Sequence, residues 1–369
     1  MAENKNQHIV PQLHLRNFSS NGKQVGVYNI PANRFVKNGT IKHEASEDYF
    51  YGKDSHTDEG LRRIETEAGR VIKNIIKTGE LPIKDSTEHL SILQFIGTLH
   101  ARTKYRRDSH NERIDEFHKL VLNRKHNISN EDLDLIKITD KNAPQHEVRT
   151  AIIGLPVIFD LKFKLIINNT TLSFWTSDNP TIFLNHFLEK KRPELNNTGW
   201  IMKGLEIFCP ISPKHILFFY DENVYKAGDK NGNIIYVNDV KDVEELNKIQ
   251  LIGATENIYF DDSFDEIYVK SFSKKFQSER VRGRFGYKAE IISEVITENT
   301  GEIFQKVISP EIRGNLNLNF VKILRKAQKI VIKEKDILLP RSEKVLRAAN
   351  WVHETFDRLD REDNNLKGI

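Results

Sequence analysis

The chain has 369 residues, of which 56 are basic, 52 are acidic and 38% are hydrophobic, and its net charge is only +4. This composition excludes a disordered chain and predicts a globular protein of one elaborated domain or two. No window approaches about 18 apolar residues, and Cys209 is the single cysteine, so we expect a cytoplasmic protein with no membrane partner, no disulfides and no Cys-rich zinc site.

A histidine and an arginine flank the first predicted helix. Pro11 suits the first turn of that helix; His8 lies just before it and Arg16 lies at or beside it. Residues 25–28 favour a strand, and residues 34–51 favour a second extended stretch. For either His8 or Arg16 alone, a surface or hydrogen-bonded structural role is the simpler interpretation.

Two helices follow, over 58–77 and 86–107. Asp58 is the expected cap of the first helix, and Glu65 lies at the border of its buried face, either as a rim residue or as the partner of a buried arginine. The second helix carries a stripe of small and polar residues that includes Gln94, Gly97 and Arg102. Such a stripe serves either a ligand that comes close to the backbone or a tight contact between helices.

The next segments alternate between helices and turns. Residues 110–125 predict a charged helix whose Arg113 and His118 have a ribonuclease-like spacing that is too short to identify a catalytic pair. A helix over 146–162 should be interrupted at Pro156, and residues 165–176 predict a hairpin around two asparagines.

The stretch Phe174–Pro180, with the sequence FWTSDNP, ends the second strand of that predicted hairpin. Because Asn179 precedes a proline, the chain should leave the strand there and hold Asp178 at its end. Polar residues at a strand end can form a binding site, although an aspartate can equally stabilise the turn itself.

The second half of the chain mixes strands with helices and ends in predicted helices. Strands are expected over 205–213, 216–220 and 258–260, and helices over 244–254, 320–333 and 342–359. Between them lies a basic segment with nearby aromatic residues, which fits nucleic-acid binding or a solvated basic face. Its candidate binding residues are Lys274, Lys275, Arg280, Arg282 and Arg284.

The chain resembles the bacterial family DUF4238 over about residues 5–265. The resemblance rests on ordered segments spread along the chain: His8-x-x-Pro11-x-x-x-Leu15-Arg16-Asn17-Phe18, Ile64-Glu65, Gln94, Ala101-Arg102-Thr103, Thr176–Pro180, Pro210–Pro213, and Leu246-Asn247 with Ala254 and Tyr259. Where the family commonly has Arg-Thr-Pro, this chain has Arg102-Thr103-Lys104. The resemblance implies a mixed α/β intracellular protein and does not extend past about residue 290. Together with the predicted elements, it leads us to expect an α+β domain over 1–290, with helices on a central, largely antiparallel sheet. A mainly helical extension is expected over 291–369. The resemblance also implies a toxin-like or accessory bacterial gene and supplies no established reaction.

Two functions suit these residues. If seven of them converge on one pocket, histidine can move a proton, arginine can hold a phosphate and the amides can orient a water, as a nucleic-acid or nucleotide hydrolase needs. The seven are His8, Arg16, Glu65, Gln94, Arg102, Asp178 and Asn179. Asp178 and Glu65 would also suit Mg²⁺. Alternatively, the same set is a buried hydrogen-bond network in a non-catalytic binding or sensing module. The sequence does not indicate a protein partner or an oligomeric state.

Overall fold

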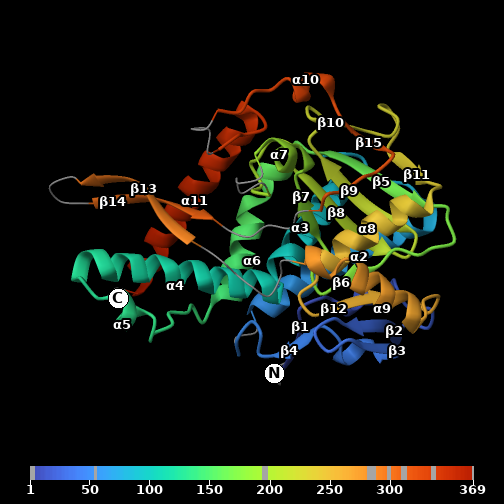
Figure 1. The fold of residues 1–369 in the computed structure, drawn as a ribbon, viewed down its shortest axis with the longest axis horizontal. Helices are drawn as coiled ribbons and strands as arrows, with labels where there is room; N and C mark the ends of the chain where they lie inside the picture. Colours follow the sequence, from blue (N-terminus) through green and yellow to red (C-terminus); the bar gives the residue numbers. More distant parts are fainter. Residues whose placement is uncertain are drawn as a thin grey trace.

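The computed structural model describes residues 5–53, 56–192, 198–280, 288–296, 301–308, 314–333 and 338–367, with only the backbone path for 288–296, 301–308, 360 and 363–367. These residues form an α+β fold in which helices pack on two principal sheets (Figure 1). The predicted fold class is therefore confirmed.

The central sheet has five strands, and only one of its neighbouring pairs, β11 with β5, is parallel. Its strands, in sheet order, are β11 (Ile234–Val237), β5 (Lys162–Asn168), β9 (His215–Tyr220), β8 (Glu206–Ser212) and β7 (Ile182–Leu184). The strands β8 and β9 confirm the strands predicted over 205–213 and 216–220.

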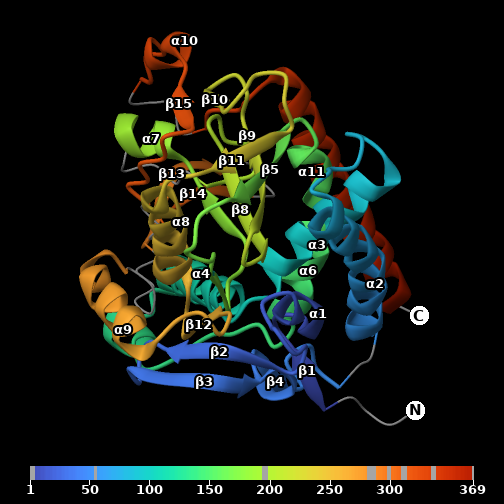
Figure 2. The ribbon, with the colours of Figure 1, turned by 90° about the vertical axis from the view of Figure 1, so that its right-hand side faces the viewer.

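Helices cover both faces of the central sheet, and its strands are mainly apolar, with Lys164 and Glu206 as buried charged exceptions. Ile207 and Cys209 of β8 pack with α2 (His56–Thr78) and α3 (Thr87–Ala101), whereas Phe208 packs with α8 (Val240–Gly253). Figure 2 shows α8 on one side of the sheet and α2 and α3 on the other. Both long predicted helices before residue 107 are present, but α2 starts two residues before Asp58, which is therefore in its first turn and not its cap.

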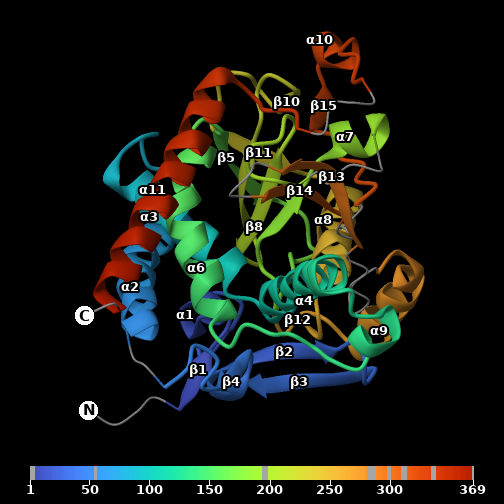
Figure 3. The same ribbon diagram turned by 90° about the vertical axis from the view of Figure 1, so that its left-hand side faces the viewer.

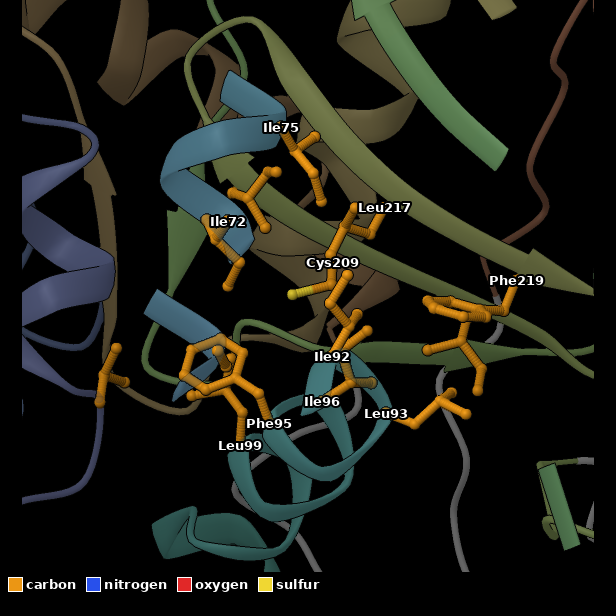
Figure 4. Packing of buried hydrophobic residues seen from close by; sticks show 14 of the residues in the cluster. Ile72, Ile75, Ile92, Leu93, Phe95, Ile96, Leu99, Cys209, Leu217 and Phe219 are labelled. Carbon is orange, nitrogen blue, oxygen red and sulfur yellow. The ribbon is translucent and has the colours of Figure 1, made fainter. Parts of the chain in front are cut away.

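The single cysteine is part of this core. Cys209 is fully buried, and Figure 4 shows it among aliphatic and aromatic side chains of α2, α3 and β9. Burial raises the pKa of its thiol to about 12, so a thiolate does not form at neutral pH.

A smaller antiparallel sheet packs beneath the central one. It consists of β3 (Arg34–Thr40), β2 (Gln24–Asn29), β12 (Asn257–Phe260) and β6 (Thr176–Ser177), in that order. Beside it lie α1 (Gln12–Arg16) and the strand pair β1 (Asn6–His8) and β4 (Ser46–Asp48). Trp175 and α9 (Glu266–Lys275) complete an aromatic cluster on this sheet.

The predicted hairpin over 165–176 is wrong. Its two strands belong to different sheets, because β5 pairs with β9 and β11 while β6 pairs with β12. The Asn168 side chain accepts from the Thr170 backbone and donates to the Leu172 carbonyl, which turns the chain away from β5. The asparagines therefore form a turn, but that turn carries the chain to the other sheet.

The predicted helix over 86–107 ends at Ala101, where a new helix begins after two residues. Ser86 caps α3, and the Thr103 hydroxyl accepts from the Arg106 backbone to cap α4 (Lys104–His126), which reaches away from the sheets in Figure 1. The chain returns through α5 (Asn130–Leu133), α6 (Ala143–Gly154) and the 3-10 turn η2 (Leu155–Ile158). The predicted interruption at Pro156 is confirmed by this change from α-helix to 3-10 turn.

Residues 314–333 and α11 (Glu343–Lys367) pack onto the earlier part of the chain. The predicted helix over 320–333 is wrong, because β15 pairs with β10 there and only a four-residue helix follows. The helix predicted over 342–359 is confirmed as α11, which lies along α6 in Figure 3. The C-terminal part contains β13 (Lys288–Ile296), β14 (Gly301–Ile308), β15 (Val321–Ile323), α10 (Arg325–Gln328) and α11. It contacts two earlier elements, α7 (His186–Lys191) and β10 (Tyr225–Ala227).

Arg341 joins this C-terminal part to the rest of the chain. Its side chain is fully buried, pairs with Asp160 at 2.9 Å and donates to the backbone carbonyls of Val157 and Met202. A domain boundary near residue 290 stays a prediction. None of the helices in the described ranges has the length and apolarity needed to cross a bilayer.

Candidate functional site

Three of the predicted site residues meet where β1, α2 and α3 come together. Arg102 Nη1 is 2.5 Å from Glu65 Oε1, Nε donates to the Tyr51 hydroxyl at 3.0 Å, and Nη2 donates to the His8 carbonyl at 2.6 Å. Arg102 is only 3% exposed, so these partners use the face of the guanidinium that a phosphate would need. We call His8, Gln12, Arg16, Tyr51, Glu65 and Arg102 the N-terminal cluster.

Arg102 lies at the junction of α3 and α4. It is the residue after the last helical position of α3, with φ −85° and ψ 28°, and Thr103 caps the next helix. Its N–H still bonds the Thr98 carbonyl, so its side chain starts in the register of α3. The Glu65 carboxylate compensates its buried positive charge.

The remaining part of the N-terminal cluster is more open. The amide of Gln12 donates to His8 Nε2 at 3.3 Å, and its oxygen accepts from Arg16 Nη2 at 2.7 Å. His8 is partly buried and Arg16 is exposed. A chain of two hydrogen bonds therefore links the exposed guanidinium of Arg16, through the amide of Gln12, to the imidazole of His8. We call this chain of hydrogen bonds the relay.

The imidazole of His8 favours its neutral form. Burial lowers the pKa of His8, and the positive charge of Arg102 lowers it further, against a hydrogen bond to the Lys42 backbone and the carboxylates of Glu65 and Asp58. Since Gln12 donates to Nε2, the ring nitrogen there carries the lone pair. A neutral imidazole is the form that a general base requires, and here its lone pair becomes available when the bond from Gln12 is displaced.

Asp178 and Asn179 lie in a different setting, at the end of β6. The Asp178 carboxylate accepts the backbone N–H groups of Thr255, Glu256 and Asn257 at 2.7, 2.6 and 3.0 Å, and Asn179 donates to the Gly253 carbonyl at 3.2 Å. These bonds hold the connection between α8 and β12. Burial raises the pKa of Asp178, although the three N–H groups lower it.

The structure therefore does not join Asp178 to the N-terminal cluster through any hydrogen bond among the described residues. Mg²⁺ binding by Asp178 and Glu65 stays a prediction. Three N–H groups bond the oxygens of Asp178, and Glu65 Oε1 is bonded to Arg102, so an ion there would compete with these partners.

Gln94 is half-buried two turns before Arg102, which places it about 12 Å away along the α3 axis. Gly97, the small residue on the same stripe of α3, allows close packing against this helix. A Cβ atom at Gly97 would lie 3.0 Å from Leu155 and 3.4 Å from Trp200, so glycine allows these two side chains to pack on α3. For Gly97 the geometry favours the tight contact between elements over the approach of a ligand.

The predicted nucleic-acid segment is only partly described. Lys274 and Lys275 are exposed at the end of α9, and Lys275 Nζ lies 4.9 Å from the centre of the Phe276 ring. Arg280 instead donates to the carbonyls of Ala254 and Thr255, so it supports the same connection as Asp178. Arg282 and Arg284 lie outside the described residues.

A second polar cluster, which the sequence interpretation missed, lies between α4 and α6. Glu147 is 5% exposed and binds Arg106 at 2.6 Å, Arg113 at 2.8 Å and His110 Nδ1 at 3.0 Å. Burial alone would raise the pKa of Glu147, but these three neighbours lower it to about 2. We call His110, Asp140, His146 and Glu147, with Arg106 and Arg113, the α4–α6 cluster.

The sequence held a signal for this cluster. Residues 106, 110 and 113 are spaced by four and three, which places them on one face of α4. Arg113 and His118, which have the ribonuclease-like spacing, do not interact with each other. Arg113 binds Glu147, and His118 Nδ1 bonds the Ile114 carbonyl one turn back.

Comparison with known proteins identifies the family and gives no reaction. No curated protein and no solved structure matches the chain. Residues 6–264 match the family described as a protein of unknown function, DUF4238, which confirms the predicted resemblance and nearly the same range. Since this match covers more than half of the 369 residues, the chain belongs to the DUF4238 family.

Proposed function

We propose that the chain is a nucleic-acid or nucleotide-directed hydrolase that acts in the bacterial cytoplasm as a toxin-like or defence effector. The observation that carries this proposal is the relay from exposed Arg16 through Gln12 to neutral His8. The working set is therefore smaller than the seven predicted residues. Arg102 and Glu65 serve as positioning residues, and Asp178 and Asn179 support the fold.

The relay supplies the groups that phosphodiester cleavage needs. His8 Nε2 takes a proton from the attacking water or hydroxyl, whose oxygen forms the new bond to phosphorus while the leaving oxygen departs and takes up a proton. Arg16 neutralises the phosphate as negative charge develops on it. The contact between Gln12 and His8 is 3.3 Å long, which a water or hydroxyl can replace at little cost.

A second function is favoured by a separate observation. Arg102 and Asp178 are both enclosed and fully engaged by protein groups, as expected for a structural network. In that case the chain is a binding or sensing module, and the exposed Lys274 and Lys275 are its available cationic contacts. The two functions differ in whether the side chains of His8 and Arg16 are required.

The experiment expresses the wild type, His8→Ala, Arg16→Ala and the control Arg62→Ala in bacteria. Arg62 is exposed on α2, where it pairs with Asp58 of the same helix. Growth and the integrity of total RNA and DNA are followed, and circular dichroism of each purified protein checks the fold. We expect growth arrest and nucleic-acid cleavage with the wild type and Arg62→Ala, and neither with the other two. Intact nucleic acids in all four cultures, with all proteins folded, would reject the hydrolase.

A further inference from the structure

We propose that the α4–α6 cluster binds one Zn²⁺, or a divalent ion of similar preference, through His110 Nε2, a carboxylate oxygen of Asp140 and His146 Nδ1. This site is separate from the N-terminal cluster and does not depend on the proposed hydrolase activity.

The three side chains already converge. One ligand atom from each lies within 4.8 Å of the others. Asp140 Oδ2 is 3.1 Å from His110 Nε2 and 2.6 Å from His146 Nδ1. Tetrahedral Zn²⁺ with bonds of about 2.0–2.1 Å needs its ligand atoms about 3.3 Å apart, so the shortest pair must open by less than about 1 Å. His146 can make this movement because half of its side chain is exposed.

A buried carboxylate orients the first histidine. Glu147 Oε1 accepts from His110 Nδ1 at 3.0 Å, which leaves Nε2 as the nitrogen directed at Asp140. The carboxylate is itself fixed by Arg106 and Arg113. A carboxylate that holds the far nitrogen of a histidine is the usual outer partner of a zinc-binding imidazole.

Asp140 is oriented by the backbone around it. Its Oδ1 accepts from the Asn142 backbone at 2.8 Å, and its own N–H donates to the Asn111 side chain at 2.8 Å. Oδ2 is thereby left facing both imidazoles. Without a metal, two ring N–H groups must converge on this one oxygen, whereas a divalent cation replaces both protons with one charge that all three ligands share.

The donor set selects among metals. Two imidazole nitrogens and one carboxylate suit zinc and its neighbours in the first transition series, whereas Mg²⁺ and Ca²⁺ prefer oxygen. Three protein ligands leave a fourth position for water, and the partial exposure of His110 and Asp140 gives solvent access to it.

The test titrates the chelator-treated full-length chain with Zn²⁺ against a chromophoric chelator, and with Co²⁺ for its visible absorption. We expect one equivalent of Zn²⁺, a tetrahedral Co²⁺ spectrum and no competition from Mg²⁺ at equal concentration. His146→Ala should lose at least tenfold in affinity, and Glu147→Gln should lose about 10- to 100-fold through loss of orientation.

The matched control is His118→Ala, which removes an exposed histidine from α4, the helix that carries His110, and should bind Zn²⁺ as the wild type does. Circular dichroism confirms that each variant is folded. The proposal is overturned if the wild type binds no more than His146→Ala, or if His118→Ala weakens binding equally. His8→Ala should bind Zn²⁺ normally, which separates this site from the proposed hydrolase site.

Discussion

Removing the Arg102 guanidinium should destabilise the whole fold. In Arg102→Ala, the Tyr51 hydroxyl and the His8 carbonyl each lose a partner, and the Glu65 carboxylate is left without its cation. The charged bond contributes about 1.5–3 kcal/mol and each neutral partner about 0.5–1.5 kcal/mol, so we expect a loss of about 3–5 kcal/mol. The 17% exposure of the Glu65 side chain places the loss toward the lower end of this range.

Urea unfolding of the purified chain, followed by circular dichroism, measures this loss from the shift of the midpoint at constant slope. The control is Arg62→Ala, because Arg62 is 58% exposed and pairs with Asp58 within one helix, which contributes at most about 0.5 kcal/mol. Glu65→Ala and the double variant complete a cycle, in which we expect a coupling energy of about 1–3 kcal/mol.

A loss below about 1 kcal/mol in Arg102→Ala would refute this reasoning, because a buried cation with three protein partners cannot be removed so cheaply. The same result would mean that the guanidinium is free to bind a ligand. Additive single losses in the cycle would show that Glu65 does not compensate the charge.

Two further predictions concern a buried histidine and a tightly packed glycine. His14 is fully buried with Nε2 2.9 Å from the Thr176 hydroxyl, and burial lowers its pKa to about 3. Below about pH 6.5 the unfolded chain therefore binds a proton at His14 that the folded chain does not bind. Urea unfolding at each pH should show that the wild type loses about 2.5 kcal/mol more stability than His14→Gln between pH 7 and 4.5. Gly26→Ala should cost about 1–3 kcal/mol in thermal or urea unfolding, because the new Cβ would lie 2.3 Å from the buried Phe260 ring, whereas Gly60→Ala, with no atom within 4 Å, should stabilise α2 by up to about 1 kcal/mol.

Local patterns predicted most helices and strands, and they failed where distant partners decide the structure. The period of α2 and the capping Ser86 are local, and both elements appear as expected. The strand β5 pairs with β9 some fifty residues later, which no turn signal at Asn168 can reveal. The change from α3 to α4 did have a local signal, since Thr103 is a good cap, but the helical spacing continues through it.

The structure brings some of the predicted site residues together and separates others. His8, Glu65 and Arg102 meet where β1, α2 and α3 come together. Asp178 lies apart from them, because the sheet order decides which backbone N–H groups its carboxylate meets. From sequence, an aspartate that binds a ligand and one that holds a loop have the same side chain and the same strand-end position.

His8 belongs to both hypotheses, and this determines which variants can separate them. Its carbonyl accepts from Arg102, while its imidazole contacts Gln12 in the relay to Arg16. Loss of activity in Arg102→Ala would therefore follow from either hypothesis, through a disordered β1 or through a displaced imidazole. Only changes confined to the imidazole of His8 and the guanidinium of Arg16 leave the buried network intact. Those two side chains, and not the buried arginine, carry the test of whether this family member is an enzyme.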